Sequence, residues 1–287
     1  MTAIAKKELR SYFHGMMGWV FFALILLTFG IYTAVLSLSK GYADFSLVPY
    51  NAQFVYLIAI PLLTMRSLSE ERRAHTDQLL YSSSLSSADI VLGKYLTSVV
   101  MLTLPLAVCC LYPLVLSGYG RVALGTAYAT MLAFFLLGCA LSAIGLFFSA
   151  ITTNPFVSAA ITFCALLFCY FASDLGGLLS VSLLAALLFF SILALAVAAL
   201  LRVLTKNWLA AGIAFAVLEA ALLLIYFFAP GLLDGSVAWA FSGVALFSKL
   251  DSFSNGILDL TALVQYLSIA WLFVFFAIQA VEKRRWS

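Results

Sequence analysis

Charged residues are missing from long stretches of this chain, and such stretches recur along its whole length. A helix rises 1.5 Å per residue, so it needs about 20 residues to cross the roughly 30 Å hydrocarbon core of a bilayer. Uncharged runs of this length are 16–39, 45–65, 95–120, 122–173, 175–201 and 260–281, and the run 207–233 is interrupted only by Glu219. The run 122–173 is too long for one helix, and the turn-forming sequence Thr152-Thr153-Asn154-Pro155 divides it. The pattern predicts an all-α integral membrane protein with about eight transmembrane helices.

Composition agrees with this pattern. Hydrophobic residues make up 65% of the chain and charged residues 9%, whereas soluble domains have about 45–50% and about 25%. A soluble enzyme is therefore excluded. The net charge is only +3 and the basic residues form no cluster, which disfavours nucleic-acid binding. The five cysteines lie in apolar runs without a CxxC pair, so we interpret them as small buried hydrophobic residues.

The distribution of basic residues predicts the orientation in the membrane. An even number of spans places both termini on the same side. Three of the 15 basic residues, Lys40, Arg121 and Lys249, lie in one set of loops, and the other twelve lie in the termini and the opposite loops. Since Lys and Arg concentrate on the cytoplasmic side, both termini are expected to be cytoplasmic. The first apolar run is longer than the core of a signal peptide, so it is expected to be a retained span.

Residues 1–15 are predicted to form an amphipathic interface helix in front of the first span. Its two faces are the apolar residues Leu9, Tyr12, Phe13 and Met16 and the cationic residues Lys6, Lys7, Arg10 and His14. The apolar face would enter the inner leaflet, and the cations would face anionic lipid or a cytoplasmic partner. The alternative is that this helix only anchors the first span.

Residues 66–94 form the long hydrophilic cytoplasmic segment between spans two and three. Ser67 and Glu70 have the spacing of a capping box, which predicts a short charged helix. A serine cluster follows, and Ser86 with Asp89 is expected to cap the helix that continues into the third span. The segment is therefore predicted to be a helical hairpin that projects from the membrane. A solvated loop without a partner is the alternative.

Residues 230–259 contain an uncharged stretch that is too short to cross a bilayer, so we expect an extracellular or re-entrant segment. Trp239, Phe241 and Phe247 could form an external lid or only an interfacial aromatic belt. Glu219 is the ionisable residue inside a predicted span. An intramembrane carboxylate is a candidate functional residue, although a protonated Glu bonded to a neighbouring helix would serve a structural role equally well.

Three stretches of the chain resemble the permease subunits of ABC-2-type ATP-binding-cassette transporters, in particular the gliding-motility and copper-maturation branch. They are KELRSYFHGMMGWVF at 7–21, MRSLSEERRAHTDQLLYSSSLSSADIVLGKYL at 65–96 and DSFSNGILDLTALVQYLSIAWLFVFFAIQAVEKRRW at 251–286. They are similar to the family's interface helix and first span, to its loop with a double Glu, a Thr and a Gly-Lys, and to its closing segment. The chain departs from the family in two extra spans, near 175–201 and 207–230, and in Asn255, where the family's pattern has Arg.

The resemblance implies partners. In that family, each permease pairs with a second permease half and two cytosolic ATPase subunits, and the loop after span two is a coupling helix seated in an ATPase groove. It implies an ATPase contact by Glu70, Glu71, Arg72, Arg73, Thr76 and Asp77. It implies a second contact by the interface helix through Lys6, Lys7, Leu9, Arg10, Tyr12 and Phe13. No cofactor is expected in this chain, because ATP and Mg²⁺ would bind the partner ATPase.

The sequence thus predicts a single permease domain over 1–287 in the bacterial inner membrane, most simply an exporter of an amphipathic or hydrophobic compound. The chain has no GxxxxGK[ST] motif, so a separate subunit is expected to hydrolyse ATP. An auxiliary extracellular subunit and force transmission instead of transport stay open. An ion-coupled secondary transporter and an intramembrane lipid enzyme are the alternatives, but one intramembrane Glu is thin support for the former, and His14 and His75 lack metal-ligand spacing for the latter.

Overall fold

The computed structural model describes residues 2–38, 45–74, 86–120, 122–179, 186–191, 194–195, 208–228 and 235–285. These residues divide into two compact units, 1–168 with 246–287 and, separately, 169–245. The first unit contains α1 (Thr2–His14), α2 (Met16–Thr33), η1 (Ala34–Leu38), α3 (Leu47–Ala52), η2 (Gln53–Val55), α4 (Tyr56–Thr64), α5 (Ser69–Arg73), α7 (Ser87–Cys109), α8 (Leu111–Ser117), α9 (Leu124–Ile151), α14 (Leu250–Ser254) and α15 (Leu260–Arg285). The second contains α12 (Trp208–Phe228) and α13 (Ser236–Val244), and α10 (Pro155–Leu179) runs from the first unit into the second.

Six helical stretches of the described residues are long and apolar enough to cross a membrane. They are Met16–Ser37, Leu47–Arg73, Ser87–Ser117, Leu124–Ile151, Pro155–Leu178 and Leu260–Arg284. Each coincides with one of the spans expected from the sequence, and the all-helical membrane fold is confirmed. The expected span 207–230 is helical as α12 but is not among the six, and the expected span 175–201 lies partly outside the described residues. The total of eight spans stays a prediction.

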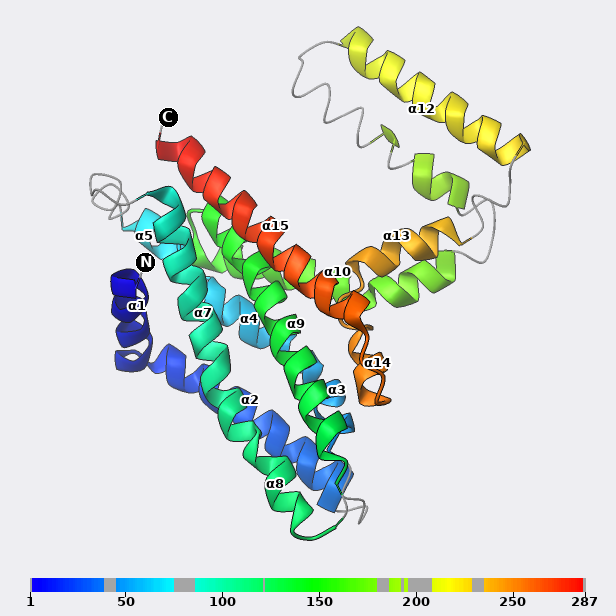
Figure 1. Cartoon of the computed structure of the whole chain (residues 1–287). Helices are drawn as coiled ribbons and strands as arrows, with labels where there is room; N and C mark the ends of the chain where they lie inside the picture. The colour runs from blue at the N-terminus through cyan, green and yellow to red at the C-terminus, as the bar shows by residue number, and fades with distance from the viewer. Residues whose placement is uncertain are drawn as a thin grey trace. The chain divides into compact units, whose positions relative to one another are not determined.

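Helix α9 is the central helix of the first unit (Figure 1), where it packs against α4, α7 and α15. Small residues allow this close packing. A Cβ atom added at Gly138 would lie 2.7 Å from the Tyr56 hydroxyl oxygen, so α4 and α9 touch at this point. The same Tyr56 hydroxyl donates a hydrogen bond to the Phe134 carbonyl at 3.1 Å, and the two rings stack. The absence of a side chain at Gly138 and the contacts of Tyr56 with Phe134 thus hold α4 close to α9.

Both ends of the chain belong to the first unit and lie at the same end of its bundle (Figure 1). One buried apolar cluster there joins Ile4 of α1, Val91 of α7, Leu146 of α9 and Val274 of α15. The Arg284 guanidinium also donates to the Ile151 carbonyl at 2.6 Å, which binds the last turn of α15 to the last turn of α9. This arrangement agrees with termini that share one side of the membrane.

Residues 235–259 contain two short helices, α13 and α14, neither of which is long enough to span. In the first unit, the Leu246 and Phe253 carbonyls accept hydrogen bonds from the Tyr266 and Thr130 hydroxyls, at 3.0 and 3.1 Å. Of the three aromatic residues named for this segment, Phe241 and Phe247 are buried and Trp239 is 80% exposed. Its extracellular position and the single permease domain stay predictions.

Candidate functional site

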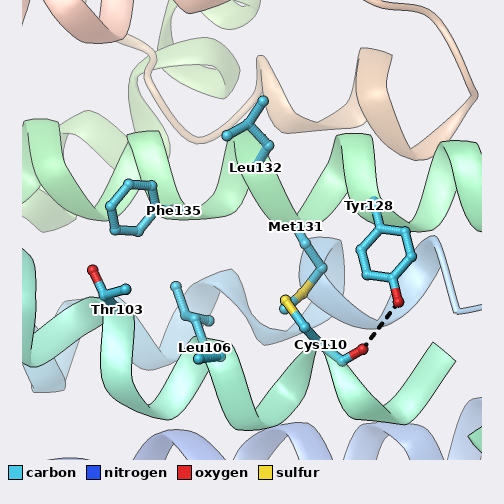
Figure 2. A pocket seen from close by; sticks show the side chains of 8 residues that line it. Thr103, Leu106, Cys110, Tyr128, Met131, Leu132 and Phe135 are labelled. Carbon is cyan, nitrogen blue, oxygen red and sulfur yellow. Dashed lines mark hydrogen bonds between the residues drawn. The ribbon is translucent and has the colours of Figure 1, made fainter. Parts of the chain in front are cut away.

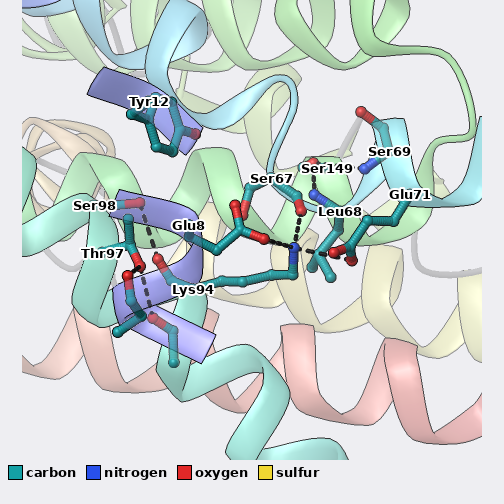
Figure 3. A network of polar contacts seen from close by, with 12 residues as sticks. Glu8, Tyr12, Ser67, Leu68, Ser69, Glu71, Lys94, Thr97, Ser98 and Ser149 are labelled. Atoms are coloured by element: carbon teal, nitrogen blue, oxygen red, sulfur yellow. Dashed lines mark hydrogen bonds and ion pairs between the residues drawn. The ribbon is translucent and has the colours of Figure 1, made fainter. Parts of the chain in front are cut away.

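Lys94 is a buried lysine near the start of α7, and its side chain is only 1% exposed. Its ammonium lies 2.9 Å from a Glu71 carboxylate oxygen and 3.1 Å from a Glu8 carboxylate oxygen. It also donates to the Ser67 backbone carbonyl. Figure 3 shows the ammonium between the two carboxylates.

The Lys94 ammonium has three donors, and a buried charge is costly unless it is paired. These three acceptors satisfy that requirement and join α1, the turn before α5, α5 and α7. We call Lys94, Glu8, Glu71 and Ser67 the Lys94 cluster.

Helix α1 packs against α7 and α2. Its inner face is formed by Ile4, Glu8 and Tyr12 at a spacing of four residues. The Tyr12 hydroxyl donates to the Leu63 carbonyl at 2.7 Å. Burial, together with the negative charge of Glu8 and Glu70, raises the pKa of Tyr12 above its ordinary value. Tyr12 therefore stays a neutral hydrogen-bond donor.

The interface-helix residues expected from the sequence separate into two groups in the structure. Lys6, Lys7 and Arg10 are exposed, whereas Leu9, Tyr12 and Phe13 are half-buried. Phe13 makes an edge-on contact with Trp19, with ring centroids 5.6 Å apart. The helix thus presents cations outward while one face is fixed to the protein.

Helix α5 is fixed at its first turn by α9. The Ser149 hydroxyl oxygen accepts hydrogen bonds from the backbone N–H groups of Leu68 and Ser69, at 3.0 and 3.2 Å. The prediction of a capping box by Ser67 and Glu70 is wrong: the N-cap residue is Leu68, with no side-chain cap. The physical reason is that α5 follows α4 through helical turns, so the extended N-cap conformation that a capping box requires does not form.

The helix after this segment begins as predicted. Ser86 is the N-cap of α7 in an extended conformation, and its hydroxyl oxygen accepts from the Asp89 backbone N–H at 3.1 Å. The Ser86 hydroxyl also donates to the Asp89 carboxylate at 2.6 Å. The rest of the expected hairpin, residues 75–85, lies outside the described residues.

The six residues expected to contact an ATPase have different positions. Glu70 and Arg73 are exposed on α5. Glu71 takes part in the Lys94 cluster, and Arg72 is buried with 5% exposure. Thr76 and Asp77 lie outside the described residues. The outward surface of α5 therefore consists of Glu70 and Arg73.

An apolar cavity of about 320 Å³ lies between α7 and α9 (Figure 2). Its walls include Leu106 and Ala107 of α7 and Met131, Leu132 and Phe135 of α9. The two hydroxyl groups among its lining residues are already engaged. Thr103 donates to the Val99 carbonyl at 2.7 Å, and Tyr128 donates to the Cys110 carbonyl at 3.2 Å. The cavity thus offers an almost wholly apolar surface, which suits a hydrophobic group.

Glu219 of α12 has a hydrogen-bond partner. The Ser191 hydroxyl lies 3.2 Å from a Glu219 carboxylate oxygen, and both side chains are partly buried. The structural interpretation of Glu219 requires a hydrogen bond to a neighbouring helical segment, and Ser191 provides one. A role in transport stays a prediction.

Sequence reasoning missed Lys94, Glu8 and Ser149 as site residues. Lys94 belongs to the Gly-Lys pair of the family resemblance, and Glu8 is the acidic residue of α1. Neither observation predicts that these two side chains form an ion pair. The Ser149 contact joins residues 80 and 81 positions apart, so no local pattern reveals it.

Comparison with known proteins identifies the family. A family model described as ABC-2 family transporter protein matches residues 37–182, just over half of the chain. This match covers the segment from the end of the first span through α10, including α5 and Lys94. A search of curated proteins and a search of solved structures found no match. The gliding-motility and copper-maturation branch stays a prediction. The match, the six apolar helices and the all-helical fold show that the chain belongs to the ABC-2 family of transporter membrane proteins.

Proposed function

We propose that this chain is the permease subunit of an ABC exporter and that a separate cytosolic ATPase drives it through α1 and α5. Membership of the ABC-2 family implies partnership with ATPase subunits. In the proposal, those subunits bind ATP and Mg²⁺, and the permease supplies the path across the membrane. A second permease half, either a copy of this chain or a related one, completes that path. The membrane is the bacterial inner membrane, and both termini are cytoplasmic.

The observation that carries the proposal is the Lys94 cluster. Glu71 on α5, Glu8 on α1 and Lys94 on α7 are held together in a buried site. Separating an ion pair that is shielded from water is costly, because it leaves a buried charge without a partner. A displacement of α5 is therefore transmitted to α1 and to α7, instead of being lost in a flexible loop. Ser149 adds a direct connection from α5 to α9.

The surface available to an ATPase lies on the outward sides of the same helices. Glu70 and Arg73 are exposed on α5, and Lys6, Lys7 and Arg10 are exposed on α1. This mixed-charge surface suits a polar partner interface, in which complementary charges determine specificity. Thr76 and Asp77, which lie outside the described residues, are proposed on the family resemblance alone to contact the ATPase as well.

The cargo is proposed to be hydrophobic or amphipathic. The cavity between α7 and α9 is apolar, and α7 carries both this cavity and Lys94. A movement imposed at the start of α7 would therefore reach the cavity, and a two-state rearrangement of the bundle would expose it to opposite sides.

Affinity purification in mild detergent tests the partnership. Tagged wild-type permease should bring down a cytosolic ATPase, and Glu70→Lys should reduce the recovered ATPase at least about tenfold, since like charges at an interface cost several kcal/mol. Asp251→Lys is the matched control, because Asp251 is also exposed but lies on α14. Equal recovery by wild type and both variants would contradict the proposed contact. Transport under a pH gradient by the purified chain alone would favour the ion-driven alternative.

A further inference from the structure

A second cavity, of about 420 Å³, lies where three candidate spans end. It belongs to the first unit, and two of its lining residues, Glu70 and Arg73, are also part of the surface proposed to contact an ATPase. Its lining includes Met17, Met65, Arg66, Glu70, Arg73 and Phe156. We call it the boundary pocket. Its lining combines the cations of Arg66 and Arg73 with the apolar side chains of Met17, Met65 and Phe156.

Helix lengths place the boundary pocket at the level of the lipid headgroups. In the span Leu47–Arg73, residues 47–65 carry no charge, and 19 helical residues at 1.5 Å per residue extend about 28 Å. The hydrocarbon core is about 30 Å thick, and the headgroup layers extend it to about 40–45 Å. The polar end of this span, which begins at Arg66, therefore lies in the headgroup layer. Met17 and Phe156 each lie one residue after the start of their own span, Met16–Ser37 and Pro155–Leu178.

The charges of the boundary pocket favour an anion. Arg66 and Arg73 contribute two guanidinium groups, and Glu70 contributes one carboxylate. The Arg66–Glu70 ion pair is long, at 3.9 Å, and both side chains are about half-exposed, so it neutralises Arg66 only weakly. No ion pair joins Arg73 to a carboxylate among the described residues. A guanidinium offers a planar set of donors that matches a phosphate.

The apolar lining indicates what the anion is attached to. Met17, Met65 and Phe156 face the same pocket as the two arginines, and Phe156 is 74% exposed. A free phosphate would leave these groups unused, whereas a phospholipid has a glycerol and acyl chains directly below its phosphate. Basic pockets between membrane helices bind lipid headgroups for this reason.

We propose that the boundary pocket binds the headgroup of an anionic phospholipid. The phosphate lies against Arg66 and Arg73, and the glycerol and first methylene groups lie against Met17, Met65 and Phe156. The site requires no ATPase and no cargo, so it goes beyond the proposed transport function and is tested separately from it.

The experiment uses the purified, delipidated full chain without an ATPase. Thermal unfolding and native mass spectrometry are recorded after addition of phosphatidylglycerol, phosphatidylcholine or inorganic phosphate. Phosphatidylglycerol should raise the melting temperature and remain bound, phosphatidylcholine should do so weakly, and inorganic phosphate should have little effect. The double variant Arg66→Gln/Arg73→Gln should bind phosphatidylglycerol about tenfold more weakly, because charge-assisted hydrogen bonds to phosphate are lost.

Two further variants test whether charge at this position, and not charge in general, determines lipid binding. Glu70→Gln removes the carboxylate next to Arg66, so it should strengthen phosphatidylglycerol binding about twofold; the proposed ATPase contact predicts no such gain. Lys6→Gln/Lys7→Gln removes the same charge as the double variant from exposed positions on α1, and it should change binding less than about twofold.

Two results would overturn the proposal. The first is equal phosphatidylglycerol binding by wild type and the double arginine variant; if that variant also lost ATPase recovery, the two arginines would belong to the ATPase contact instead. The second is stabilisation by inorganic phosphate as strong as that by the lipid.

Discussion

The two ends of α7 lie in opposite chemical environments. Near its start, Lys94 is buried among two carboxylates and a backbone carbonyl. Near its end, Leu106 and Ala107 face the apolar cavity shared with α9. Electrostatic contacts are directional and strong when buried, whereas apolar contacts are non-directional and tolerate different occupants. A single helix therefore connects a fixed attachment point to a cavity that can accept different occupants.

The largest expected effect is the removal of Lys94. Lys94→Met would leave Glu8 and Glu71 close together without their shared cation. Removing one partner of a buried ion pair costs about 3–5 kcal/mol, so the melting temperature in detergent should fall sharply. The triple variant Lys94→Met/Glu8→Gln/Glu71→Gln should recover most of this loss, because no unpaired charge remains. A stable single variant would show that the Lys94 cluster is not an attachment point.

A smaller effect is expected where α5 meets α9. Ser149→Ala removes the acceptor of two backbone N–H groups, so it should cost about 1–3 kcal/mol of unfolding free energy. Ser142→Ala is the matched control. Ser142 is equally buried on the same helix, but its hydroxyl donates only to the Gly138 carbonyl of its own helix. Equal melting temperatures of the two variants would argue against a fixed α5.

The contact of α1 through Tyr12 can be tested by its pH dependence. Tyr12→Phe should cost about 0.5–1.5 kcal/mol at neutral pH, because one hydrogen bond is lost. The folded protein raises the pKa of Tyr12, so this stability is fully present below the ordinary tyrosine pKa of about 10. It declines as the pH rises above that value. Wild type should therefore lose its advantage over the variant in alkaline unfolding experiments, and a constant difference between pH 7 and 11 would contradict this explanation.

The smallest effect on stability is expected at the other end of α7. Ala107 is exposed at the cavity, so Ala107→Leu should change the unfolding free energy by less than about 0.5 kcal/mol. It should nevertheless reduce transport of a hydrophobic cargo several-fold, because it fills the cavity. Leu104→Met, at an exposed position of α7 outside the cavity lining, is the control. Full transport by Ala107→Leu in a reconstituted complex would exclude the cavity from the path.

The sequence was sufficient for features that depend on neighbouring residues. Hydrophobic run lengths located the six spans, and the Ser86 cap of α7 was read from a three-residue spacing. The sequence was insufficient to predict contacts between side chains that are far apart along the chain. Glu71 and Arg72 could be read as outward charges because their inward orientation depends on the packing of α5, and Lys94 could be read as a flanking charge because Glu8 is 86 residues away. Ser67 failed as a cap because α5 follows α4 through helical turns, and the Leu68 and Ser69 N–H groups donate instead to the distant Ser149.

Photo-crosslinking in native membranes can detect the proposed contact between α5 and an ATPase. A crosslinking amino acid is placed at Glu70 or Arg73, the exposed positions of α5, and at Asp251 of α14 as the control. Both α5 positions should crosslink to a cytosolic ATPase subunit, and Asp251 should not. Labelling of the α5 positions by a membrane-impermeant reagent added outside intact cells, without any crosslink to an ATPase, would contradict the proposed contact.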